Sequence, residues 1–251
     1  NGGGNTTFDG KKLHDYAEPS RVVGILLEAK AFHPTRTARN HLRILAAEGN
    51  IDKKRIDEVL EIVGLKTEAK KGPGKFSLGM SQRLGLAAAI LAEPKYLILD
   101  EPSNGLDPEG VAWLRKFLSD YADKGNAVFV SSHLLSEMQL MADNIVVIGR
   151  GKLIADTSIK ELTSGKAAGV FVRAAKLSEL EKALTLAKIE FKKIDGGLKV
   201  TGKTSDEIGR LAFSKGVPLL ELANRSASLE DVFLQLTEGS EEFLSGNGGG
   251  K

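Results

Sequence analysis

The sequence predicts an α/β fold with a mostly parallel sheet, a helical subdomain and a small C-terminal α+β appendage. Apolar runs of strand length alternate with longer segments whose apolar residues recur at helical spacing, as in parallel strands joined by helices. A chain of 251 residues can hold a main domain with an appendage. We expect a main domain over residues 1–160, an accessory region over 166–239 and a flexible, glycine-rich tail over 240–251.

The composition excludes several functional classes. The 35 basic and 33 acidic residues nearly cancel, so bulk charge gives no reason to expect a nucleic-acid partner. The absence of cysteine rules out disulfides, thiolate catalysis and cysteine metal sites. We find no secretory leader and no apolar run approaching ~18 residues, so we expect any membrane spans to come from a partner.

The first elements of the main domain are a strand and a group of helices. Val22–Leu27 is an apolar run of strand length. Residues 35–64 carry apolar side chains at helical spacing in two segments, and Gly64 ends the second. The glycine-rich run 70–75 predicts a loop, and Gln82–Ala92 an alanine-rich helix. These helices form a helical subdomain over about residues 33–92.

Three more strands complete the main domain, and the accessory region repeats the alternation. Asp107 and Pro108 provide an N-cap and a first helical residue for a helix between two of these strands. The predicted strands are Tyr96–Leu99, Ala127–Val130 and Ile145–Ile148. In the accessory region we predict strands at 170–172, 191–194, 198–200 and 218–222, and helices at 177–188, 206–215 and 229–236.

An acidic pair follows the apolar strand Tyr96–Leu99. Asp100 and Glu101 stand side by side, and two adjacent carboxylates repel each other unless something positive lies nearby. Magnesium prefers oxygen ligands and keeps most of its waters, so one carboxylate can suffice to hold it. The second could then act as a general base toward water. A plain acidic pair that ends a surface strand is the alternative.

Two neighbouring features favour the metal-and-water interpretation. The segment Phe76–Arg83 leads into the alanine-rich helix, where free backbone N–H groups and the helix dipole favour an anion. The strand Ala127–Val130 is followed by Ser-Ser-His, so His133 is expected at the same edge of the sheet as Asp100 and Glu101. We assign no function to the other three histidines.

These segments, in this order, closely resemble the ATP-binding-cassette (ABC) ATPases, a family with the P-loop NTPase fold. FSLGMSQR resembles the family's signature loop, YLILDE its Walker B strand, SNGLD its D-loop and SSH its switch histidine. The resemblance implies ATP and Mg²⁺ as cofactors. It also implies that Asp100 binds the magnesium ion, that Glu101 is the catalytic glutamate, and that His133 contacts the γ-phosphate.

The resemblance also implies a set of nucleotide-contacting residues. Ser77 and Gly79 would bind the γ-phosphate held by the opposite subunit, Asp107 would contribute to the contact between subunits, and Gln82 belongs to the same signature segment. Glu28 stands where the family usually has the glutamine of its Q-loop; a plain solvent-exposed carboxylate is the alternative there.

Two departures in the signature loop narrow the subgroup. Leu78 and Met80 replace the usual glycine and glutamine. Together with Glu28, these replacements resemble the subgroup of bacitracin-resistance and lantibiotic-immunity exporters.

One family motif is missing. No Gly-x-x-x-x-Gly-Lys-Ser/Thr loop occurs, although such a loop normally holds the phosphates. Residues 1–7, NGGGNTT, resemble its end, with Asn5 in place of the lysine, but Phe8 follows directly instead of a helix. Removing one donor to a developing oxyanion costs ~2.7–4 kcal/mol, and micromolar binding is worth only about 8 kcal/mol. We therefore expect this chain to bind ATP poorly and to hydrolyse it negligibly.

The resemblance implies an ATP-hydrolysing subunit that forms a head-to-tail dimer and powers a separate transmembrane permease. Its expected location is cytoplasmic, on the inner face of the cell membrane, and no nucleic acid is expected. Two alternatives remain: a soluble ABC ATPase without a transport role, and a noncatalytic dimerisation or interaction module. The first would usually carry coiled coils, tandem cassettes or basic extensions, which we do not find; the missing loop favours the second.

Overall fold

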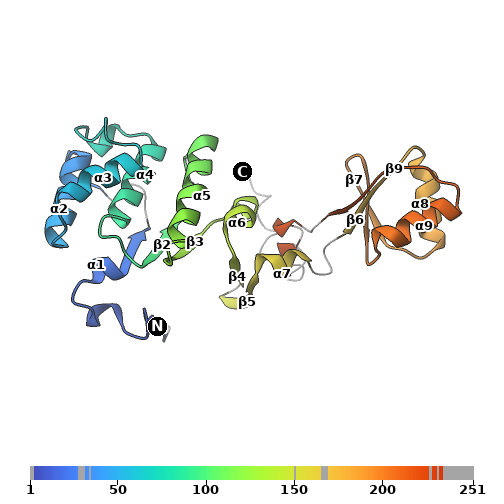
Figure 1. Cartoon of the computed structure of the whole chain (residues 1–251), viewed down its shortest axis with the longest axis horizontal. Helices are drawn as coiled ribbons and strands as arrows, with labels where there is room; N and C mark the ends of the chain where they lie inside the picture. The colour runs from blue at the N-terminus through green and yellow to red at the C-terminus, as the bar shows by residue number, and fades with distance from the viewer. Residues whose placement is uncertain are drawn as a thin grey trace, which may run out of the picture. The chain divides into compact units, whose positions relative to one another are not determined.

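The computed structural model describes residues 3–27, 32–33, 35–149, 151–164, 169–225, 228–230 and 232–233. The chain divides into two compact units, Asn1–Leu134 and Leu135–Lys251 (Figure 1). Among the described residues, no helix has the length and apolar character needed to cross a membrane.

The first unit is built on a three-stranded parallel sheet. Its strands are β1 (Val23–Leu26), β2 (Tyr96–Asp100) and β3 (Ala127–Ser131), in the order β1-β2-β3. This confirms all three strands predicted for this part of the chain. The pairing places Asp100 of β2 opposite Ser131 of β3, so the residues that follow both strands emerge at the same edge.

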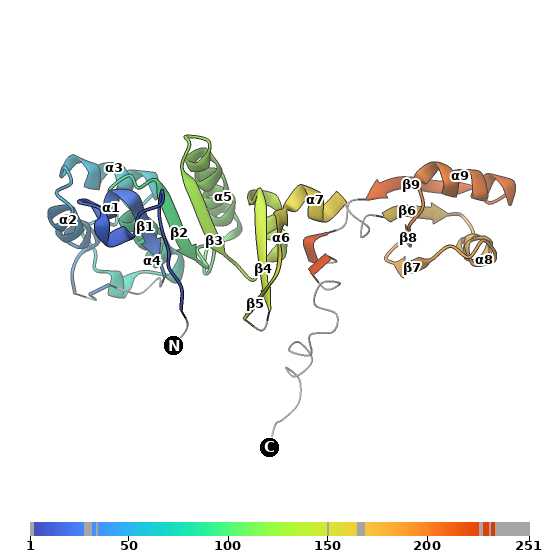
Figure 2. The ribbon, with the colours of Figure 1, turned by 90° about the horizontal axis from the view of Figure 1, so that it is seen from below.

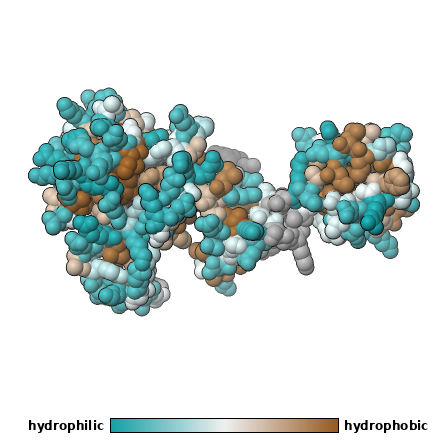
Figure 3. Space-filling view, viewed as in Figure 1, coloured by the Kyte–Doolittle hydropathy of each residue, from teal (hydrophilic) through white to brown (hydrophobic). Residues whose placement is uncertain are grey.

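Helices accompany this sheet, and those between β1 and β2 form the helical subdomain. Most of the visible surface over the subdomain is hydrophilic (Figure 3), while Leu42, Leu60 and Leu84 are fully buried inside it. The helical elements are η1 (Leu13–Asp15), α1 (Pro19–Val22), α2 (Ala38–Glu48), α3 (Lys54–Ile62), η2 (Pro73–Lys75), α4 (Leu78–Ala89) and α5 (Pro108–Ala122).

Two glycines let α4 approach β1 closely. A Cβ at Gly24 would lie 2.0 Å from the carbonyl oxygen of Ala89, and a Cβ at Gly85 would lie 2.5 Å from a methyl of Leu26. Helix α4 therefore packs against β1, whereas α5 lies along β3 (Figure 2). This contact fixes the helix that carries the signature residues against the sheet that carries the acidic pair.

Helix α4 begins earlier than the sequence indicated. We predicted Gln82–Ala92, but the helix runs from Leu78 to Ala89. The cause is an N-cap: the Ser77 side chain accepts a hydrogen bond from the Met80 N–H at 3.1 Å, which satisfies one of the free donors of the first turn. Most of the expected signature loop is therefore already helical.

The face of the parallel sheet that does not meet α4 carries an apolar row. Ile25, Ile98 and Phe129 are register partners across the three strands. Ile25 is 46% exposed and Phe129 is 60% exposed. Parallel sheets are normally covered on both faces. Within the described residues, this row is incompletely covered.

The second unit contains a hairpin and a separate four-stranded sheet. Strands β4 (Asn144–Gly149) and β5 (Lys152–Ser158) pair antiparallel, flanked by α6 (Leu135–Met141) and α7 (Ile159–Ser164). The sequence predicted β4 but not β5, α6 or α7. The larger sheet contains β6 (Gly169–Ala174), β7 (Phe191–Ile194), β8 (Gly197–Thr201) and β9 (Leu219–Arg225), with α8 (Leu177–Leu186) and α9 (Ser205–Ser214).

The larger sheet has a ferredoxin-like arrangement. Its chain order is β-α-β-β-α-β and its strand order is β7-β8-β6-β9, all antiparallel. Val172, Leu198 and Leu180 belong to its buried core. The predicted elements up to β9 are confirmed. The predicted helix 229–236 and tail 240–251 extend beyond the described residues.

The boundary between the units falls at Leu134, whereas we expected a domain boundary near residue 160. Residues after Leu134 pack with the described residues 229–232, which explains the difference. The Gln139 side chain of α6 accepts a hydrogen bond from the Leu229 N–H at 2.8 Å. Leu162 of α7 packs against the buried Val232.

Candidate functional site

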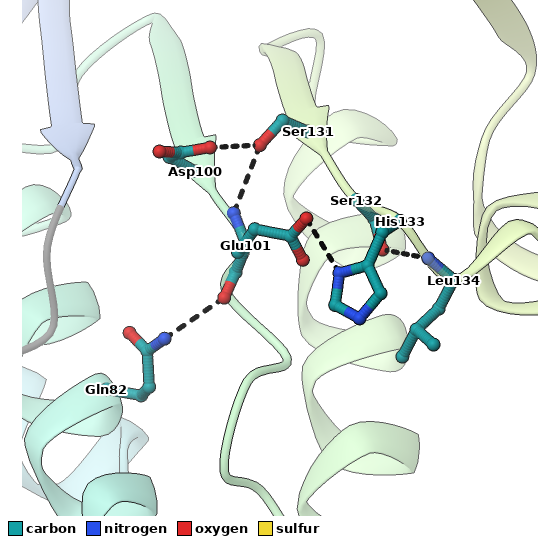
Figure 4. Close-up of polar contacts among 7 residues, drawn as sticks. All are labelled: Gln82, Asp100, Glu101, Ser131, Ser132, His133 and Leu134. Carbon is teal, nitrogen blue, oxygen red and sulfur yellow. Dashed lines mark hydrogen bonds and ion pairs between the residues drawn. The ribbon is translucent and has the colours of Figure 1, made fainter. Parts of the chain in front are cut away.

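The predicted acidic pair and histidine lie together at the carboxyl edge of the parallel sheet (Figure 4). Asp100 is the last residue of β2 and Glu101 follows it, while Ser131 ends β3 and His133 lies two residues beyond. Asp100 is exposed, so its charge is not removed from water. The buried part of β2 is carried by Leu97 and Leu99.

Ser131 links the two carboxylate residues. Its hydroxyl donates to Oδ1 of Asp100 and accepts a hydrogen bond from the Glu101 N–H at 3.1 Å. The same N–H also reaches the Ser131 carbonyl at 3.2 Å, which continues the β2–β3 pairing past the strand end. The hydroxyl therefore orients the Asp100 carboxylate and fixes the start of the Glu101 turn.

Glu101 and His133 form a side-chain pair. His133 Nδ1 lies 2.9 Å from Glu101 Oε1, and the two side chains are 64% and 28% exposed, respectively. Glu101 Oε2 is buried and has no hydrogen-bond partner among the described residues. One carboxylate oxygen is thus oriented by the imidazole, and the other is a buried acceptor without a partner among the described residues.

The backbone of Glu101 is unusual. Its φ is +46°, a left-handed conformation that is uncommon for residues other than glycine. Its carbonyl accepts hydrogen bonds from Gln82 Nε2 at 3.0 Å and from the Asn104 N–H at 3.1 Å. Gln82 is buried, so it faces the interior of the site rather than solvent.

The signature residues pack closely on the turn that follows Glu101. A Cβ at Gly79 would lie 2.8 Å from the carbonyl oxygen of Gly105, and a Cβ at Gly105 would lie 2.4 Å from the Leu78 side chain. Gly105 has φ +75°, which favours glycine. Ser77 is exposed at the N-terminus of α4, where a helix favours an anion.

The remaining predicted residues have separate locations. The Asp107 side chain accepts a hydrogen bond from the Gly110 N–H at 2.8 Å and caps α5, as predicted. It follows the turn that packs on Gly79. Glu28 lies outside the described residues.

The start of β2 is fixed by Tyr121 of α5. Its hydroxyl donates to the carbonyl of Pro94, two residues before the strand. Burial, reinforced by the charge of Glu93, raises the pKa of Tyr121 to about 12. The hydrogen bond from this hydroxyl anchors the segment that leads into the strand presenting Asp100.

The residues at this edge suit magnesium. Asp100 offers exposed carboxylate oxygens, and a magnesium ion that keeps its waters and contacts a phosphate needs few protein ligands. Within the described part of the chain, no group of three or more His, Cys, Asp or Glu side chains could hold a metal by itself.

Residues 3–7 do not form a phosphate-binding loop. They are exposed and outside any helix or strand, and Phe8 then forms an isolated bridge with Lys11. No helix begins directly after Thr7, since the next helical element is η1 from Leu13, so these residues do not join a loop to a helix N-terminus of the kind that holds phosphates.

Two features of the site were not foreseen from the sequence. In the segment Ser131-Ser132-His133, we expected a functional role only for the histidine. In the structure, Ser131 also links Asp100 and Glu101. The available signal for this link was that the two parallel strands end at the same level, which places Ser131 opposite Asp100. The bond between Gln82 and the Glu101 carbonyl had no signal in the sequence, because it depends on how α4 packs beside β2.

Family models match two parts of the chain. The ABC transporter model matches residues 2–104, which include the signature helix and the acidic pair. A model described as a domain of unknown function matches residues 168–230, the ferredoxin-like part of the second unit.

Known proteins resemble the chain over most of its length. The bacitracin transport ATP-binding protein BcrA of Bacillus licheniformis is 38% identical over 246 residues, which cover 94% of this chain and 78% of that protein. The lantibiotic transport ATP-binding protein SrtF of Streptococcus pyogenes is 35% identical over 61% of this chain and 66% of its own.

A solved structure described as the ATP-binding subunit of an ABC transporter superposes with a TM-score of 0.56. It is 25% identical and covers 62% of this chain and 67% of that chain. This agrees with the predicted P-loop NTPase-type α/β fold. The chain therefore belongs to the ABC transporter family, among its ATP-binding subunits.

Proposed function

We propose that this chain is the nucleotide-binding subunit of an ABC exporter. Its acidic pair binds a magnesium ion and orients a hydrolytic water beside ATP. The single observation that carries the proposal is the Glu101–His133 pair, with Nδ1 and Oε1 2.9 Å apart, at the strand end that presents Asp100. A chance acidic pair would not require a histidine from the neighbouring strand.

Each residue has a distinct part in the proposed hydrolysis. Asp100 holds the magnesium ion, which when bound supplies positive charge to the phosphate oxygens. Glu101 orients the attacking water and accepts its proton, and His133 orients that carboxylate and contacts the γ-phosphate. A positioned base of this kind typically contributes ~10²–10⁴-fold to the rate.

The complete site is proposed to need two subunits. Ser77 and Gly79, at the N-terminal end of α4, would bind the γ-phosphate held by the opposite copy of a head-to-tail dimer. Asp107 would contribute to the contact between the copies. Gln82 was expected to contact the nucleotide as well, but its burial favours a role within the subunit. By the resemblance to the exporter subgroup, Glu28 would act in metal sensing and coupling.

We propose that the subunit powers a separate transmembrane permease and is held at the inner face of the cell membrane through it. The names of the relatives support export of bacitracin-like or lantibiotic-like compounds. Helices α2 and α3 are the proposed docking region for the permease. Copurification of a tagged chain with a polytopic membrane protein tests this partnership, and a soluble partner instead would favour a role outside transport.

The missing phosphate loop leads to a separate proposal about activity. This chain is expected to bind ATP poorly and to show no Mg²⁺-dependent hydrolysis above a Glu101→Gln control. The exposed residues 3–7 support it, because they form neither a phosphate-binding loop nor the start of a helix. Clear turnover above the control would refute it.

A loop-restored chain separates the two proposals. In this variant, a strand, a Gly-x-x-x-x-Gly-Lys-Thr loop and a helix of the family's usual pattern are placed before Phe8. The site proposal predicts Mg²⁺-dependent ATP hydrolysis in this variant. If neither chain binds nucleotide, the noncatalytic interaction module becomes the better account.

A further inference from the structure

Gln82 makes a buried contact with the residue proposed as catalytic base. It lies on α4, is 5% exposed, and donates from Nε2 to the Glu101 carbonyl at 3.0 Å (Figure 4). A carbonyl can only accept, so the side-chain amide must present its N–H₂ group here. The contact joins the signature helix to the end of β2.

The conformation of Glu101 needs such support. A non-glycine residue at φ +46° is unfavourable and persists where the surroundings fix it. The Glu101 N–H bonds to two oxygens of Ser131, and the carbonyl accepts from Gln82 and Asn104. These bonds fix both peptide groups of Glu101 and so set the direction of its side chain, which ends 2.9 Å from His133.

The oxygen of the Gln82 side-chain amide indicates that this residue is not present for stability alone. Its Oε1 is buried and has no hydrogen-bond partner within the described residues. A buried polar atom without a partner is costly, and an apolar side chain at this position would avoid the cost. The one bond that Gln82 makes therefore points to a role at Glu101.

We propose that Gln82 is a positioning residue that holds the left-handed backbone of Glu101 and thereby places its carboxylate against His133. This inference rests on the proposed function of Glu101. It assigns Gln82 an action through Glu101 in the same subunit, in place of direct contact with nucleotide.

The placement of Gln82 gives this bond a second consequence. The same helix begins beside Ser77, about 7–8 Å along the helix axis from Gln82 at 1.5 Å per residue. The signature segment and the carboxylate are thus linked through one rigid element.

Amide hydrogen exchange tests the positioning role without any nucleotide. Gln82→Met keeps the length of the side chain and removes the donor, and Leu84→Met is the matched control on the same helix. In Gln82→Met, we expect the Asn104 and Glu101 amides to exchange about tenfold faster, as expected for the loss of one buried hydrogen bond. The His133 ring resonances should also shift. Leu84→Met should leave all three signals unchanged.

Two outcomes would overturn the inference. One is unchanged exchange and unchanged His133 resonances in Gln82→Met; the other is the same local change in Leu84→Met. If Gln82→Met does not fold, the unaltered chain still decides the matter. Its Gln82 side-chain N–H should exchange slowly and show a nuclear Overhauser contact to the Asn104 amide. Exchange at the rate of a free amide would contradict the proposal.

The loop-restored chain adds a kinetic readout. There, Gln82→Met should lower kcat about tenfold while leaving KM for ATP unchanged, because the bond positions the base and does not bind substrate. A rise in KM with unchanged kcat would assign Gln82 to nucleotide binding instead. If the loop-restored chain is inactive while the exchange measurements show the Gln82–Glu101 bond intact, the proposed function fails, whereas the hold of Gln82 on the Glu101 backbone stands.

Discussion

His133 Nδ1 and Glu101 Oε1 lie 2.9 Å apart, although the two residues follow different strands. This contact orients one oxygen of the carboxylate and leaves Oε2 buried without a described partner. The distance is short enough for a charge-assisted hydrogen bond when the imidazole is protonated.

Removing the imidazole should therefore slow hydrolysis. We expect His133→Ala to lower the turnover of the loop-restored chain about 10–100-fold, because a hydrogen bond to a charged group is worth ~1.5–3 kcal/mol. His14→Ala is the matched control, since His14 is exposed and pairs only with Asp15 in the described structure. Steady-state ATPase assays provide the measurement. Equal turnover in the two variants would exclude His133 from the site.

Ser131 should support magnesium binding, because its hydroxyl donates to Asp100. We expect Ser131→Ala to weaken Mg²⁺ binding by the loop-restored chain about 10–100-fold, which is the usual cost of losing the hydrogen-bond partner of a metal ligand. The measurement is a Mg²⁺ titration of ATPase activity. Ser132→Ala is the control, because the Ser132 hydroxyl accepts only the Leu134 N–H in the described structure. A similar loss in both variants would count against the Asp100 assignment.

Asp107 caps α5 through the Gly110 N–H. We expect Asp107→Ala to lower the free energy of unfolding by about 1 kcal/mol, measured by urea denaturation. Asp107→Asn keeps a capping oxygen and should unfold like the unaltered chain. If Asp107→Asn lowers ATPase activity in the loop-restored chain without changing stability, its charge acts at the subunit contact. If Asp107→Ala is as stable as the unaltered chain, the N-cap contributes nothing measurable.

Glu207 gives the ferredoxin-like part a pH-dependent contribution. Its ion pair with Lys203 and its capping bond from the Thr204 N–H lower the pKa of Glu207 to about 2. Because the pKa is lowered on folding, the stabilisation is fully present above the ordinary value of about 4.3 and disappears as the pH falls through about 2.

The matched variant is Glu207→Gln, which can still serve in a capping box but carries no charge. Thermal unfolding should show the unaltered chain as more stable than the variant at pH 6. The difference should shrink steadily between about pH 4 and pH 2. A difference that grows as the pH falls would contradict the assigned cause.

The sequence predicted that the acidic pair and the histidine lie at one edge of the sheet, because parallel strands carry their ends to the same side. Asp100, Glu101 and His133 follow two such strands, so their proximity required only the right strand assignment. The capping of α5 was equally local, since Asp107 and Pro108 stand side by side.

The features that escaped prediction depend on packing between distant segments. The bond from Gln82 to Glu101 requires α4 to lie beside the end of β2, and the left-handed φ of Glu101 is not encoded in its residue type. The start of α4 was predicted too far along the chain, because the prediction followed the alanine-rich segment and did not use Ser77 as an N-cap. Strand β5 was missed because it contains polar residues and pairs only with β4.

The most direct test of the account compares the loop-restored chain with its Glu101→Gln variant under saturating MgATP. The two side chains have nearly the same size, so the comparison isolates the carboxylate as base. We predict turnover in the loop-restored chain and a loss of ~10²–10⁴-fold in the variant, with nucleotide affinity retained. Equal turnover in both chains would contradict the assignment of Glu101 and, with it, the function proposed for this site.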